Sequence, residues 1–199
     1  MHPSDAFRVE DEAALLAHLQ LYPLMTFAAA PQGRLLVAQA PVVVRRRASG
    51  LAVDFHLSRG NALAAHIATG FAAVAVSLGP DVYVSPDWYE GADQVPTWNY
   101  LSVEAEGPVS PLDEAGLVRL LDDLSAQEEA RLAPKPPWTR HKMSPGRFDA
   151  MLRGIVGASL AVERLEGTFK LSQNKNEADR AGVIAALGDH PIGRRMAGP

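Results

Sequence analysis

The stretch that decides the fold class is Leu51-Ala52-Val53-Asp54-Phe55-His56-Leu57, which continues directly into Ser58-Arg59-Gly60-Asn61. In its first part, large apolar side chains alternate with Ala52, Asp54 and His56. Successive side chains of a β-strand point to opposite faces, so this alternation predicts a strand with one apolar face. The second part is polar and contains glycine, so it predicts a turn that leads into a helix.

Strands dominate the rest of the chain. Apolar or alternating runs predict them at residues 24–29, 35–44, 71–78, 82–85, 101–109 and 155–168. Gly79-Pro80 is expected to end the strand before it, and Arg45-Arg46-Arg47 with Ser49-Gly50 to form a polar hairpin end. Since most strands follow one another with short turns, we expect a mainly β protein with attached helices (α+β). Its antiparallel sheet is expected to close into a barrel, and a doubly wound parallel sheet is disfavoured.

Helices are predicted between these strands and after the last one. They are expected after Asp11 and at residues 61–69, 113–131, 147–152 and 176–187. The prolines at 134–137 predict a loop, and the tail after Pro191 is expected to be loose. The chain has 199 residues and is 47% hydrophobic, which is enough for one core. Residues 1–199 are therefore expected to form a single domain with C-terminal helical additions.

The composition excludes several classes of function. The net charge is −4 and the pI is about 5.8, so the chain has no general attraction to phosphate backbones. The sequence contains no cysteine, which excludes disulfides, thiolate nucleophiles and cysteine-bound metals. The histidines lack the spacing of a zinc site, so no metal is expected, and no phosphate-binding loop or nucleophile elbow is present. With neither a signal peptide nor an apolar run of about 20 residues, a cytoplasmic protein without membrane contact is expected.

The turn after the 51–57 strand is the first segment suited to bind a ligand. A helix N-terminus exposes free backbone N–H groups and attracts anions. Ser58 adds a hydroxyl and Arg59 a guanidinium group, so a phosphate would fit there. The alternative is an ordinary helix cap by Asn61 with Arg59 in water, and the local pattern alone favours this alternative.

A second segment is rich in aromatic residues. Two Trp and three Tyr lie between Tyr83 and Tyr100. They could form a wall beside a planar ligand, an oligomer interface, or a hydrophobic cap on one end of the barrel. Thr97 and Asn99 add polar groups that could fix the orientation of a ligand.

A third segment, Gly167–Lys175, is dense in hydrogen-bonding side chains. Lys170, Gln173 and Asn174 could bind a phosphate or a ring carbonyl. Asn174 or Asn176 could equally cap the last helix, and the local pattern favours that interpretation.

Taken together, these segments resemble the PaiB family, described as FMN-binding negative transcriptional regulators. The matching stretches are His56–Asn61, Tyr83–Tyr89, Val95–Tyr100 and Phe169–Asn174, and they share the family's order and spacing. The last two stretches are specific only in combination. Gly60 departs from the Ala that is more typical of the family, a change that should leave phosphate binding intact.

The resemblance implies a split β-barrel that binds FMN at the interface of a homodimer. The phosphate would lie near Ser58, Arg59 and Asn61 in such a protein. The aromatic loops would approach the flavin ring or the subunit seam, and the third segment would add polar contacts. The residues implied in these two regions are Ser85, Trp88, Trp98, Asn99, Lys170, Gln173 and Asn174.

Two functions from different classes follow. The resemblance implies a regulator in which FMN or its redox state biases a dimer that represses transcription, directly or through a partner. No helix-turn-helix is evident, and Arg45-Arg46-Arg47 from both subunits would be the only basic surface for DNA. The alternative is a flavin-dependent oxidoreductase that passes electrons from NAD(P)H to a small acceptor, with no catalytic residue identified because the cofactor carries the chemistry. A third interpretation is a split barrel that no longer binds flavin.

Overall fold

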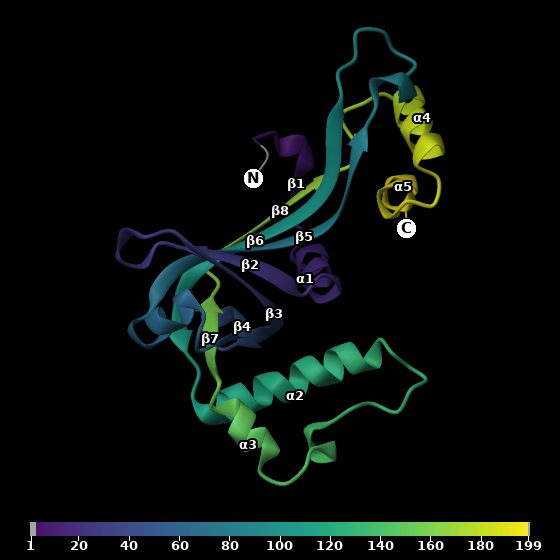
Figure 1. Cartoon of the computed structure of the whole chain (residues 1–199). Coiled ribbons are helices and arrows are strands. Elements are labelled where there is room, and N and C mark those ends of the chain that lie inside the picture. The colour runs from purple at the N-terminus through teal and green to yellow at the C-terminus, as the bar shows by residue number, and fades with distance from the viewer. Residues whose placement is uncertain (1–2, 199) are drawn as a thin grey trace. The chain divides into compact units, whose positions relative to one another are not determined.

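A computed structural model describes residues 3–198 (Figure 1). Eight β-strands are present in this range. Their bounds are β1 Arg8–Val9, β2 Leu24–Ala29, β3 Leu36–Arg47, β4 Gly50–Ser58, β5 Phe71–Val84, β6 Thr97–Pro111, β7 Ile155–Ala161 and β8 Arg164–Lys170. They form one sheet in the order β1-β8-β6-β5-β2-β3-β4-β7, and a further pairing of β6 with β7 closes six of them into a barrel. The prediction of a mainly β, antiparallel barrel with attached helices is confirmed.

Five α-helices and several 3-10 helices are present within residues 3–198, and several of them begin at a capping side chain. Their bounds are α1 Glu12–Leu21, α2 Glu114–Ala130, α3 Arg147–Leu152, α4 Glu177–Leu187 and α5 Pro191–Ala197, with 3-10 helices that include η3 Ala62–Thr69 and η4 Pro86–Trp88. The side chains of Asp11, Asn61 and Asp113 each accept a backbone N–H at the start of the following helix. None of the helices within residues 3–198 has the length and apolar character needed to cross a bilayer.

The chain divides into two compact units. The barrel unit comprises residues 19–76 and 105–165, and the terminal unit comprises residues 3–18, 77–104 and 166–198. Strands β5 and β6 run through both units.

In the barrel unit, the apolar face predicted for residues 51–57 points into the barrel. Phe55 of β4 stacks on Phe27 of β2 with their ring centroids 4.0 Å apart, and both are fully buried. The outer face of β4 is also covered, because α2 packs on β3 and β7 through Leu117, Leu120 and Leu124 (Figure 1). Burying each such side chain stabilises the fold by about 1.5–3 kcal/mol. The covered outer face explains why β4 carries buried residues on both sides.

The terminal unit is held together by α4 and α5. Asp179 of α4 is buried, and its Oδ1 accepts the backbone N–H groups of Glu90 at 2.9 Å and Gly91 at 3.0 Å. Gly182 lets α4 approach η4 closely, since a Cβ there would lie 2.1 Å from the carbonyl oxygen of Trp88. The loop that follows η4 is therefore attached to the first turns of α4.

Several sequence predictions of the element boundaries are wrong. β5 continues through Gly79-Pro80, since the fixed φ of proline is compatible with extended backbone. β6 begins at Thr97 instead of Leu101, in keeping with the strand preference of β-branched and aromatic residues. The tail after Pro191 forms α5, whose Ile192 and Met196 lie one turn apart and are both buried.

The predicted strand at 155–168 is two strands, because the chain changes partners between them. Before the break β7 pairs with β4, and Val162 still donates its N–H to the carbonyl of Leu51. Glu163 instead donates to the carbonyl of Glu106, and β8 then lies beside β6. Gly107 permits the crossing, since a Cβ there would lie 1.8 Å from the carbonyl oxygen of Ala161.

Arg45-Arg46-Arg47 lies at the end of the β3–β4 hairpin, as predicted, and Arg46 and Arg47 are exposed there. All three residues belong to β3 and pair with β4 as far as Arg47 opposite Gly50. Arg45 and Arg47 both bind the buried carboxylate of Asp54, each at 2.6 Å. Arg45 and Arg47 therefore neutralise a buried charge on the outer side of the barrel.

Candidate functional site

The polar turn after β4 is tied to the segment that follows α3. Arg59 donates its backbone N–H to the carbonyl of Gly154 at 3.0 Å. Its Nε donates to the carbonyl of Arg153 at 2.8 Å. The first bond fixes the backbone of the turn and the second orients the guanidinium group, although the side chain is exposed. Within residues 3–198, the two terminal nitrogens of Arg59 make no hydrogen bond, so they are available to an anion.

Arg59 lines a pocket of about 330 Å³ in the barrel unit. The other charged residues of the lining are Asp113 and Glu114 at the start of α2, and Asp149 and Arg153 on or just after α3. Asp113 is already engaged, because its Oδ1 accepts the N–H of Gly116 at 2.6 Å. An anion would therefore be favoured beside Arg59 and Arg153 in this pocket and disfavoured beside its carboxylates.

Ser58 and Asn61 have structural roles in this turn. The Ser58 hydroxyl lies 3.4 Å from the N–H of Gly60, and the side chain is exposed. Asn61 accepts the N–H of Leu63 at 2.9 Å and so caps η3, which was the alternative weighed for it. The Asn61 carbonyl oxygen is thus occupied, whereas Ser58 and Arg59 present polar atoms to solvent.

The aromatic segment presents two exposed rings on neighbouring strands. Tyr83 of β5 is 45% exposed and Trp98 of β6 is 53% exposed, which is unusual for such large apolar groups. Their rings meet edge to face with centroids 6.2 Å apart. Ser85 and Trp88 instead belong to η4, where the Ser85 hydroxyl accepts the N–H of Asp87 at 3.3 Å. The exposed pair is the part of this segment that a planar ligand could reach.

Asn99 faces the interior of the terminal unit. It is fully buried, and its Nδ2 donates to the Ser172 hydroxyl at 2.8 Å and lies 3.5 Å from Met196 Sδ. Its Oδ1 has no hydrogen-bond partner among the described residues. The Tyr89 hydroxyl is buried too, and burial, reinforced by the charge of Asp179, raises the pKa of that phenol. Asn99 thus belongs to a closed polar cluster under α5.

The third segment forms a tight turn that uses most of its own polar groups. Gln173 donates to the carbonyl of Phe169 and accepts the N–H of Leu171, both at 2.6 Å. Lys170 donates to the Thr97 hydroxyl, and burial, with the nearby charge of Lys175, lowers the pKa of its amine. Asn174 is exposed and makes no hydrogen bond within the described chain.

The ten predicted site residues fall into two sets. Ser58, Arg59 and Asn61 belong to the barrel unit, and the other seven to the terminal unit. Within its set, Lys170 meets Thr97, the neighbour of Trp98. Sequence reasoning missed Arg153, because its contribution is a backbone carbonyl and a side chain brought in by a distant helix. It also left Tyr83 unassigned, because the exposure of Tyr83 depends on a strand register that no local pattern contains.

The closed antiparallel barrel with attached helices is the fold of the flavin-binding split barrels. Residues 1–164 match the family described as "Putative FMN-binding domain", and the chain belongs to this FMN-binding family. The resemblance to PaiB is confirmed by a relative from Bacillus subtilis (strain 168), the protease synthase and sporulation protein PAI 2. It is 28% identical over 193 residues, which cover 96% of this chain and 92% of the relative.

Solved structures share the fold. The FAD and heme binding protein from Mycobacterium smegmatis is 18% identical with a TM-score of 0.60, over 92% of this chain and 81% of that chain. The flavocytochrome Anf3 from Azotobacter vinelandii is 19% identical with a TM-score of 0.54, over 91% and 78%. At these identities the likeness shows the fold alone.

Proposed function

We propose that this protein holds FMN with the phosphate at the Ser58-Arg59 turn. The observation that carries the proposal is Arg59 itself, whose guanidinium group is oriented by the Arg153 carbonyl while its terminal nitrogens stay unpaired. A preoriented guanidinium group binds phosphate at a smaller entropic cost than a free one. Ser58 and Arg153 supply the neighbouring donors, and the bound flavin supplies electron-transfer chemistry.

In the terminal unit, the exposed rings of Tyr83 and Trp98 are proposed, separately, as a surface for a planar ligand. Exposed aromatic faces on a rigid strand pair suit a planar ring system. Lys170, Asn174, Gln173, Ser85, Trp88 and Asn99 remain proposed contacts from the family resemblance, and Asn99 and Gln173 are the weakest of them because their polar groups point inward or are already used.

We also propose that the two units form one domain, because β5 and β6 run through both. We further propose that the protein is a homodimer. An uncharged, exposed face of β2 and β3 supports the dimer. Leu24 and Val37 are each 63% exposed on this face, beside Thr26, Ala28, Gln39 and Pro41. Such a face is typical of an interface and unusual for a monomer surface. A cytoplasmic location remains part of the proposal.

The regulatory role stays a proposal, and direct DNA binding through Arg45-Arg46-Arg47 has lost its support. Arg45 and Arg47 are paired with Asp54, so these two cations are less available to phosphates. No observation favours one acceptor or substrate for an oxidoreductase. Anaerobic titration of the flavin-loaded protein with NADH and NADPH separates the two roles, since only the oxidoreductase bleaches its flavin at a catalytically useful rate.

Replacing Arg59 tests the site directly. We expect Arg59→Ala to weaken FMN binding by about 1.5–3 kcal/mol, because a charge-assisted contact to the phosphate is lost. Flavin fluorescence titration measures the affinity, and Arg147→Ala is the matched control, since Arg147 is also exposed and lies outside the pocket lining. Equal FMN affinity in Arg59→Ala and Arg147→Ala would remove Arg59 from the site.

A further inference from the structure

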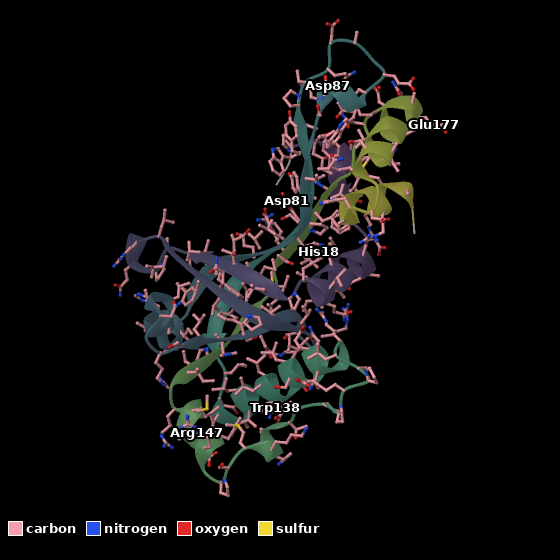
Figure 2. All side chains as sticks on the ribbon, turned by 45° about the vertical axis from the view of Figure 1, so that its right-hand side comes forward. His18, Asp81, Asp87, Trp138, Arg147 and Glu177 are labelled. Atoms are coloured by element: carbon pink, nitrogen blue, oxygen red, sulfur yellow. The ribbon has the colours of Figure 1, made fainter. Side chains whose placement is uncertain are left out.

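The barrel unit contains a second hollow that the flavin proposal does not use. It has a volume of about 330 Å³ and lies between α2, α3 and the proline-rich loop that joins them. The loop is fixed near the C-terminal end of α2, where Trp138, labelled in Figure 2, donates its backbone N–H to Glu129 at 2.8 Å. The hollow is therefore held open by defined contacts, and its volume lies in the range of small-molecule sites.

The lining is mostly apolar and partly aromatic. Trp138 and Phe148 contribute rings, and Met143 and Met151 contribute thioethers, which pack favourably on aromatic groups. Trp138 is 40% exposed and Met151 is 56% exposed, so large apolar surface faces the hollow without being covered by the rest of the chain. These side chains suit a planar aromatic ligand.

The charges of the lining cancel. Among the described residues that line the hollow, the charged ones are Arg140 and Asp122, and their Nε and Oδ1 atoms lie 2.9 Å apart. The Arg140 guanidinium group also stacks over the Phe148 ring at 5.0 Å. A charged ligand would gain no unpaired counterion here and would lose its hydration, so the hollow favours a neutral one.

A histidine nitrogen in the lining lacks a hydrogen-bond partner among the described residues. His56 of β4 contributes its ring, and within residues 3–198 no group forms a hydrogen bond to its buried Nδ1 atom. Burial lowers the pKa of this imidazole, so the ring is neutral near pH 7 and each nitrogen either donates or accepts. A hydroxyl group satisfies an imidazole nitrogen in both cases, because it donates and accepts.

We infer that this hollow is a binding site for a small, neutral phenol-type molecule, whose ring packs against Trp138 and Phe148 and whose hydroxyl bonds to His56 Nδ1. The site is separate from the proposed phosphate contact at Arg59, although Leu152 and Ile155 line both hollows. The inference does not depend on FMN, because none of the atoms that carry it belongs to the Ser58-Arg59 turn.

Isothermal titration calorimetry of the flavin-loaded protein tests the site with three probes of similar size. We expect 4-methylphenol to bind at one site per chain. Toluene, which lacks the hydroxyl, should bind at least five-fold more weakly, and 4-methylbenzoate, which carries a charge, should not bind detectably. In His56→Phe the preference for 4-methylphenol over toluene should disappear while both still bind.

A charge placed in the wall completes the test. Met151→Glu should weaken 4-methylphenol at least ten-fold, whereas Leu132→Glu should not change it, since Leu132 is equally exposed at 54% but lies outside the lining. Circular dichroism checks that both variants fold. The inference is overturned if 4-methylphenol fails to bind, if Met151→Glu binds it as the wild type does, or if the phenol displaces FMN and so occupies the flavin site.

Discussion

The buried carboxylate of Asp54 gives two residues of the arginine run at 45–47 a structural role. Its carboxylate is buried between β3 and β4 and binds both Arg45 and Arg47, while Arg47 also donates to the Ser159 hydroxyl at 2.9 Å. Burial alone would lower the pKa of Arg45, but the carboxylates of Asp123 and Asp54 outweigh it and raise that pKa. A run of three arginines thus serves the barrel wall, which a count of charges along the chain cannot reveal.

Removing this carboxylate tests that account. Asp54→Asn should lower the free energy of unfolding by about 2–3 kcal/mol, because two guanidinium groups lose a charged partner although both still reach water. Urea unfolding measures the change. Glu106→Gln is the control, since its ion pair with Arg164 is exposed on both sides and contributes about 1 kcal/mol or less. Similar losses in the two variants would contradict the special position of Asp54.

One buried and one partly buried histidine, His18 and His56, predict a pH dependence of stability. Burial lowers the pKa of His18 and of His56 below 6.5 in the folded protein. The unfolded chain then takes up protons that the folded chain does not, so the free energy of unfolding falls as pH drops below about 6.5. Thermal unfolding between about pH 7.5 and 5.5 should show this decrease, with a shallower slope in the His18→Gln/His56→Gln double variant. The exposed His141→Gln should keep the wild-type slope, and a pH-independent wild type would contradict the account.

At the scale of elements, helix caps and apolar runs in the sequence correctly predicted where several helices and strands begin. Asn61 and Asp113 begin helices where the sequence indicates, and β2 spans the predicted residues 24–29. The change of partner between β7 and β8 was missed, because it depends on the close approach of Gly107 to a distant strand. The candidate site divides in the same way: Arg59 is visible in the sequence, whereas its fixed orientation depends on the carbonyl of Arg153.

Another close approach of elements can be tested at Gly182. An added methyl group would meet the carbonyl oxygen of Trp88 at 2.1 Å, and neither backbone can yield without moving α4 away from η4. Gly182→Ala should therefore lower the free energy of unfolding by about 1–3 kcal/mol in spite of the better helix propensity of alanine. The exposed Ala186→Ser on the same helix should cost about 0.5 kcal/mol. Stabilisation by Gly182→Ala in denaturant unfolding would refute the packing.

At the scale of the whole molecule, the barrel accounts for the family and the exposed surfaces account for the proposed function. The match to the FMN-binding family covers residues 1–164, which include the barrel unit apart from Leu165. The proposed phosphate contact at Arg59 and the uncharged face of β2 and β3 both belong to that unit. The phosphate contact and dimer formation are therefore proposed as properties of the barrel unit.

The most direct test of this account is the visible absorption spectrum of the purified protein after it is mixed with FMN and passed through gel filtration. We predict that the protein retains about one molecule of flavin per subunit. The flavin should elute together with a protein peak of dimer size. Protein that elutes without flavin would contradict the central claim that this barrel holds FMN.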